Sequence, residues 1–168
     1  MQNRTSRSIV TFLMAAGLTA LATACASNKA GTEGKEDAVA RISLAEMTAP
    51  ARAAVEKLTV GGKIEKIDKE TEKGKEIYDV EATVNGKHME YAIATDGSVV
   101  GTETGINFGE LPEAVQTAAA KYFGGSTGLE PARVEEDGQT IYEIEGKKNG
   151  KKAAATFDPT GKLAGEEK

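Results

Sequence analysis

The sequence EIYDVEATVNGK at residues 76–87 returns 64 positions later as TIYEIEGKKNGK at residues 140–151. Six of the twelve letters are identical, and two more exchange only Asp for Glu or Val for Ile. In the first copy Tyr78 and Val80 alternate with polar residues, the period-two pattern of a strand with one apolar face. The Asn-Gly pair then favours a tight hairpin turn. The stretch therefore predicts a strand and a hairpin that occur twice.

The segments before these hairpins align at the same offset. SLAEMTAPARAAVEKLTVGG at residues 43–62 lies over NFGELPEAVQTAAAKYFGGS at residues 107–126. Apolar residues recur at helical spacing in both segments, and a Gly-Gly pair ends each one. Repetition at a fixed period indicates one supersecondary unit used more than once. The predicted unit is a helix followed by three or four antiparallel strands.

The helix starts differ between the two segments. Ser43 and Glu46 have the form of a capping box, but a proline at position 50 would break a helix that began there. We therefore expect a short turn at residues 44–47 and the helix itself at residues 49–58. In the second segment Pro112 can take the first helical position, where its missing N–H group is harmless.

The small size of each unit favours one sheet shared by both. A unit of roughly 60 residues buries only about 60 % of its unfolded surface and is marginal alone. Two units side by side can join at a sheet edge and extend one core. The predicted fold class is α+β, with tandem helix-plus-antiparallel-sheet repeats at residues 42–105 and 106–168. We expect both helices on one face of one continuous sheet.

The first 24 residues have the three parts of a signal peptide, a basic start, an apolar stretch and small residues before the cleavage region. Cleavage after residues 22–24 (Ala-Thr-Ala) would release a soluble protein with a free Cys25. Alternatively, Leu-Ala-Thr-Ala-Cys at residues 21–25 resembles the bacterial lipoprotein box, which implies lipidation of Cys25. We favour lipidation, because an odd cysteine in an exported protein is otherwise a reactive liability. Residues 25–41 then form a polar tether to a membrane of the cell envelope.

Composition excludes one class of partner. The chain has 168 residues, 39 % of them hydrophobic and 28 % charged, with a formal net charge of -5. Removal of Arg4 and Arg7 with the signal peptide would leave about -7. Nucleic-acid binding needs clustered Lys and Arg to neutralise phosphates, so a nucleic-acid partner is not expected.

The ordered motifs of the two units resemble a known family. Ser-Leu-x-Glu-Met, the Gly-Gly break, Ile-Tyr-x-Val/Ile-Glu and Asn-Gly-Lys are similar to the PepSY-like domains of bacterial envelope proteins. Such domains are related in fold to the β-lactamase-inhibitor protein, whose tandem units form one concave sheet backed by helices. The resemblance implies binding to, or inhibition of, an extracytoplasmic protein, often a peptidase. It carries over no catalytic residue.

Sequence motifs for catalysis are weak. Residues 124–128 read Gly-Gly-Ser-Thr-Gly, but a nucleophile elbow follows a strand and opens a helix, and this segment ends a predicted helix. His88 is the only histidine, and a zinc site would need further ligands. We expect His88 to be a solvent-exposed strand residue. No calcium-loop motif is present either, so neither a metal nor a cofactor is predicted.

Alternating carboxylates mark the polar face of the predicted sheet, which we expect to be solvated or to bind a partner. Its candidate residues are Asp79, Glu81, His88, Glu90, Glu143 and Glu145. The sequence thus predicts a non-enzymatic, exported envelope lipoprotein that presents this face to another protein such as a peptidase. The alternative is a periplasmic sensor that binds a small ligand, a peptide or a cation on the same face.

Overall fold

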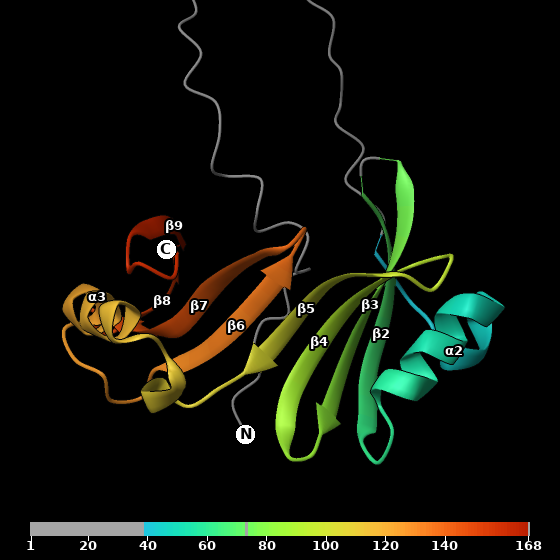
Figure 1. Ribbon diagram of the computed structural model, residues 1–168, viewed down its shortest axis with the longest axis horizontal. Helices are drawn as coiled ribbons and strands as arrows, with labels where there is room; N and C mark the ends of the chain where they lie inside the picture. The colour runs from blue at the N-terminus through green and yellow to red at the C-terminus, as the bar shows by residue number, and fades with distance from the viewer. Residues whose placement is uncertain (1–38, 73, 168) are drawn as a thin grey trace, which may run out of the picture.

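The computed structural model describes residues 39–72 and 74–167. The expected signal peptide, Cys25 and most of the expected tether lie outside these residues. Within them, nine strands form one antiparallel sheet in which neighbours in sequence are neighbours in space (Figure 1). The strands are β1 (Ala40–Arg41), β2 (Lys63–Glu72), β3 (Lys75–Val84), β4 (Lys87–Ala94), β5 (Val99–Gly105), β6 (Glu130–Glu136), β7 (Gln139–Lys148), β8 (Lys151–Phe157) and β9 (Leu163–Glu167).

Two α-helices accompany the sheet, α2 (Ala49–Leu58) and α3 (Glu113–Phe123). A 3-10 turn precedes each one, η2 (Leu44–Glu46) and η3 (Phe108–Glu110). The order of turn, helix and four strands therefore occurs twice along the chain. Helix α2 begins and ends where the sequence predicts.

Both helices pack on the same face of the sheet. Cross-strand pairs connect Ala82 through Met89, Thr104 and Arg133 to Tyr142, so these five residues share one face. The residues at the two ends of this row belong to the strand faces that α2 and α3 cover. In Figure 1 the helices lie at opposite ends of the sheet, with β5 and β6 between them. The predicted α+β class, with one sheet and helices on one side, is confirmed.

Each helix covers a core of its own. Under α2 the buried residues are Met47, Ala51, Val55, Ile67, Tyr78, Val80, Tyr91 and Ile93. Under α3 they are Leu111, Val115, Ala119, Phe123, Ile144, Ala155 and Phe157, with Tyr142 packed against them. The strand residues that the repeated motif places inward, Tyr78 and Val80 with Tyr142 and Ile144, do lie beneath their helices.

Capping boxes form before both helices. The backbone N–H of Ser43 donates to Glu46 Oε2 at 2.8 Å, and that of Asn107 donates to Glu110 Oε2 at 2.7 Å. These hydrogen bonds hold the pKa of both carboxyl groups below the usual value. Pro112 was predicted to be the first residue of the second helix. Instead, α3 begins at Glu113 and the proline occupies the N-cap position.

The hairpin turns use the residues that the sequence indicates. Asn85 and Gly86 have φ angles of 52° and 76°, and Asn149 and Gly150 have 53° and 77°. Two successive positive φ angles match the right-handed twist of the flanking strands, which explains the Asn-Gly pairs. Both hairpins are therefore confirmed.

Strands β5 and β6 join the two halves. They pair antiparallel from Gly101 opposite Glu136 to Gly105 opposite Ala132. The N–H of Ile106 continues the ladder by donating to the carbonyl of Pro131 at 3.0 Å. This β5–β6 seam makes one sheet of the two halves, as predicted.

A candidate binding face opposite the helices

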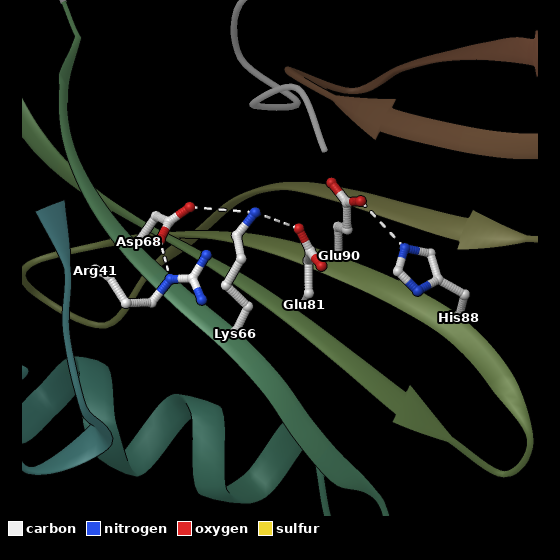
Figure 2. A network of polar contacts seen from close by, with 6 residues as sticks. All are labelled: Arg41, Lys66, Asp68, Glu81, His88 and Glu90. Atoms are coloured by element: carbon white, nitrogen blue, oxygen red, sulfur yellow. Dashed lines mark hydrogen bonds and ion pairs between the residues drawn. The ribbon is translucent and has the colours of Figure 1, made fainter. Parts of the chain in front are cut away.

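The polar candidates of the sequence lie on the sheet face opposite α2 and α3, called the helix-free face below. In Figure 2 the labelled side chains of this face stand on the side of the sheet away from α2. The period of two along each strand puts acidic residues there on five successive strands. They are Asp68 of β2, Asp79 and Glu81 of β3, Glu90 of β4, Glu103 of β5 and Glu136 of β6.

Cross-strand pairing sets like charges beside each other on this face. Asp68 lies opposite Asp79, and Glu90 lies opposite both Glu81 and Glu103. Directly opposed side chains have Cβ atoms only about 5 Å apart, and like charges in such pairs are destabilising. The arrangement therefore opposes folding rather than assisting it.

Two cationic side chains, Arg41 and Lys66, bind the outer carboxylates Asp68 and Glu81. Arg41 Nε donates to Asp68 Oδ1 at 2.6 Å, and Lys66 Nζ lies 3.2 Å from Asp68 Oδ2 and also contacts Glu81. Burial lowers the pKa of Lys66, but its bonds to Glu81 and Asp68 outweigh that effect and raise the pKa above the usual value. Figure 2 shows these contacts as one connected chain from Arg41 to Glu81.

Asp79 and Glu90 correct the expectation of a solvated face. They are 2 % and 3 % exposed, because the carboxylates are close together on a face that also buries Ala92 and Val134. Asp79 Oδ1 and Glu90 Oε2 are buried and make no hydrogen bond within the described part of the chain. Burial, followed by the neighbouring carboxylate of Glu90, raises the pKa of Asp79 to about 8.

His88 departs from its expected exposure. Its side chain is 30 % exposed, and its Nε2 lies 3.1 Å from Glu90 Oε1 (Figure 2). The register explains this contact, since His88 and Glu90 are two residues apart on one strand and share a face. The histidine therefore stands beside the buried carboxylates at the rim of the candidate site.

Two small residues separate four of the carboxylates. Ala92 of β4 lies opposite Gly101 of β5, with Asp79 beyond the alanine and Glu136 beyond the glycine. Glu90 and Glu103 occupy the next row on the same two strands. Asp79, Glu90, Glu103 and Glu136, none more than 9 % exposed, are called the carboxylate ring below.

The remaining candidates lie farther along the same face. Glu143 and Glu145 are half-buried on β7, opposite Thr156 and Ala154 of β8. Strands β5 and β6 separate them from Glu90. The structure therefore brings Asp79, Glu81, His88 and Glu90 together and leaves the two β7 carboxylates apart.

Several members of the site are additions to the sequence prediction. They are Arg41, Lys66, Asp68, Glu103 and Glu136. The last three carboxylates sit at alternating positions of the weaker predicted strands. Their proximity to Asp79 depends on the order of five strands in the sheet, which the sequence does not give directly.

The Gly-Gly-Ser-Thr-Gly segment at residues 124–128 does not have the setting of a nucleophile elbow. Gly124 caps the end of α3 with a φ of 79°, so Ser126 lies in a turn that ends a helix, as expected. No three His, Cys, Asp or Glu residues of the described chain are arranged to hold a metal ion. Nor does this part of the chain contain a helix with the length and apolar character needed to span a membrane.

Comparisons with known proteins place the fold. No family model and no curated protein matches the sequence. Solved structures from Bacteroides do match. A candidate periplasmic protein from Bacteroides eggerthii aligns with a TM-score of 0.57 and 22 % identity over 72 % of this chain and 88 % of its own. A DUF2874 family protein from Bacteroides uniformis gives 0.55 and 21 % over 71 % and 87 %.

A third neighbour is described as a BLIP-like protein. A BLIP-like protein from Bacteroides fragilis aligns with a TM-score of 0.52 and 22 % identity over 72 % of this chain and 85 % of its own. At this identity the likeness establishes the fold alone. The chain therefore has a BLIP-like fold.

Proposed function

We propose that the chain is an exported, non-enzymatic module of the cell envelope that binds another extracytoplasmic protein through its helix-free face. The observation that carries this proposal is the pair of buried, unpartnered carboxylate oxygens of Asp79 and Glu90 on that face. A buried polar group without a hydrogen bond destabilises the fold by about 1–3 kcal/mol. Local rules of folding are broken mainly at functional sites, so this face is the best candidate for one.

The fold and the leader segment support the cellular context. One neighbour is described as BLIP-like and another as a candidate periplasmic protein. The sequence begins with the three-part pattern of a secretory signal. A periplasmic inhibitor-like module, with a peptidase as the expected class of partner, agrees with both observations.

We further propose that the two halves are PepSY-like units, at residues 42–105 and 106–168, and that Cys25 is lipidated. The repeated motifs and the repeated element order support the first point. The lipoprotein-like box supports the second. Incorporation of radiolabelled fatty acid is expected in the full chain and lost in Cys25→Ser, and labelling that persists in the variant contradicts the anchor.

Site-specific photo-crosslinking in producing cells tests the partner. A photoreactive residue replaces Thr83, which shares the helix-free face with Glu81, or Thr104, which lies on the opposite face of the sheet. Both threonines are half-buried, so they form a matched pair. We expect a discrete crosslinked protein from position 83 and none from position 104. Equal crosslinking from both positions, or none from either, refutes the proposal.

A further inference from the structure

The carboxylate ring gathers carboxyl groups from both halves of the molecule. Asp79 and Glu90 come from the first half, and so does Glu103, whereas Glu136 comes from the second. The β5–β6 seam brings Glu136 opposite Gly101 and so completes the ring. The site is therefore a product of joining the halves, and neither half contains it alone.

The centre of the ring has a floor of small residues. Ala92 and Gly101 are paired across β4 and β5, and both are buried. A methyl group and a hydrogen atom rise less from the sheet than the carboxylate side chains around them. Ala92 is fully buried in the free chain, so a partner side chain reaches this floor only when the carboxylate side chains around it move apart.

Asp79 and Glu90 of the carboxylate ring each keep an oxygen without a hydrogen bond in the described chain. One oxygen of Glu90 is 3.1 Å from His88, and its other oxygen, Oε2, points away from the histidine (Figure 2). Asp79 Oδ1 likewise has no hydrogen bond in the described chain, and Asp79 is only 2 % exposed. Buried polar groups in folded proteins have partners in the large majority of cases. A bound cation with several N–H donors would satisfy both oxygens.

The spacing favours an extended organic cation over a metal ion. No three ligating residues of the described chain meet at metal-binding distance. Asp79 and Glu90 are diagonal neighbours on adjacent strands, about 5–8 Å apart at their Cβ atoms. A guanidinium group has five N–H donors in a planar fork, so it can bond two carboxylates of different residues at once. It is also more weakly hydrated than an ammonium group and loses less on burial.

We propose that the carboxylate ring is a receptor for an arginine side chain on an extended segment of the partner protein. This inference rests on the proposed function and gives that partner a chemical identity. The guanidinium group lies over Ala92 and Gly101 and donates to Asp79 Oδ1 and Glu90 Oε2. The net charge of the chain, -5, favours the approach of a basic segment.

Binding of a defined peptide tests the inference. The probe is a fluorescently labelled Gly-Ser peptide with two central arginines, and its control carries citrulline, an uncharged analogue of arginine, at the same positions. Fluorescence anisotropy with the purified full chain is expected to show binding of the arginine peptide at least about tenfold tighter than the citrulline peptide. Equal affinities for the two peptides overturn the inference.

Matched variants locate the binding. Asp79→Asn and Glu90→Gln are each expected to weaken binding of the arginine peptide about tenfold. Glu135→Gln is the control, because Glu135 is an exposed carboxylate next to Glu136 on the same strand and faces the other way. Wild-type affinity in both ring variants, or an equal loss in the control, overturns the inference. Circular dichroism verifies that each variant is folded.

His88 offers a second measurement on the unmodified protein. It is the only histidine and lies beside Glu90, so its imidazole signals in a proton NMR spectrum report on the carboxylate ring. The arginine peptide is expected to shift these signals, and the citrulline peptide is not. If calcium chloride or spermidine shifts them at lower concentration than the arginine peptide, the face binds a small cation and the inference is wrong.

The two experiments separate the two proposals. Crosslinking of a protein from position 83, without any preference for the arginine peptide, retains the proposed function and rejects the arginine receptor. Absence of any crosslink rejects the proposed function, whatever the peptide result.

Discussion

Gly97 and Gly161 occupy equivalent places in the two halves, each in a turn pressed against the start of a helix. A Cβ atom on Gly97 would lie 2.7 Å from the carbonyl oxygen of Pro50, and one on Gly161 would lie 2.5 Å from that of Ala114. Both glycines have positive φ angles, 87° and 81°. The loop after β4 and the loop after β8 therefore hold α2 and α3 close through backbone contact.

Alanine at either glycine should destabilise the protein more than alanine in an open turn. Gly97→Ala and Gly161→Ala are each expected to lower the free energy of unfolding by about 3 kcal/mol, through a strained φ angle and a clash with helix backbone. Gly86→Ala is the control, because Gly86 has a φ of 76° but a Cβ atom there would meet nothing within 4 Å. Gly86→Ala should lower the free energy of unfolding by about 1 kcal/mol. Urea unfolding measures all three, and equal losses contradict the contact.

Asp79→Asn should stabilise the protein at alkaline pH. The pKa of Asp79 rises from 3.8 to about 8 in the folded state, so folding favours the protonated carboxyl group. The stabilisation from this group is complete below about pH 4 and is lost as the pH rises toward 8. A neutral amide avoids the loss, and we expect a gain on the order of 3 kcal/mol at pH 8. Chemical denaturation at several pH values measures it.

The shape of that pH profile is diagnostic. Between pH 4 and 8 the wild-type protein should lose stability more steeply than Asp79→Asn. The charged groups that act on Asp79 are Glu90, Glu70, Lys66 and Glu81. Glu135→Gln, on the other face, should leave the profile unchanged. Parallel wild-type and Asp79→Asn profiles would show that the carboxyl group is solvated in the folded protein.

Core deletions in either half should act on one unfolding transition. Val80 and Ile144 are equivalent by the 64-residue offset, and both are fully buried beneath their helices. Val80→Ala should lower the free energy of unfolding by about 2 kcal/mol and Ile144→Ala by about 3 kcal/mol. Because one sheet joins the halves, calorimetry should show a single transition shifted in both variants. A split transition would mean that the β5–β6 seam does not couple the cores.

Tyr122 should ionise later than an ordinary tyrosine. Burial and a 2.8 Å hydrogen bond from its hydroxyl group to Glu166 Oε2 raise its pKa to about 12. Tyr122→Phe should remove a phenol that titrates near pH 12 in an ultraviolet absorbance titration. Glu166→Gln should bring that step toward pH 10, since it removes the charged acceptor. An unchanged titration in Glu166→Gln would contradict the bond.

Local signals of the sequence were sufficient for the two helices, the two hairpins and their order. The Asn-Gly pairs specify two hairpins, and the capping box of Ser43 with Glu46 separates a short turn from α2. These features depend on residues within one turn of each other. The 64-residue repetition also predicted that the halves would extend one sheet. The two-residue strand β1 was missed because Ala40 and Arg41 are too few to show a period.

Burial on the helix-free face could not be predicted from the same signals. Alternating polar residues are typical of a solvated strand face, and Asp79 and Glu90 follow that pattern. Their exclusion from water depends on neighbours from β5 and β6, which are distant in sequence. The period of two correctly gave the face to which each carboxylate belongs, but it carries no information about what lies beside that face.

The β5–β6 seam also has a consequence for biosynthesis. During the proposed export the first half emerges before β6 (Glu130–Glu136), and β5 then presents a row of unpaired N–H and C=O groups. Such an edge readily takes up a strand from a neighbouring nascent chain. The interval between emergence of Gly105 and of Glu136 is therefore when the first half most needs a periplasmic chaperone to cover its open edge.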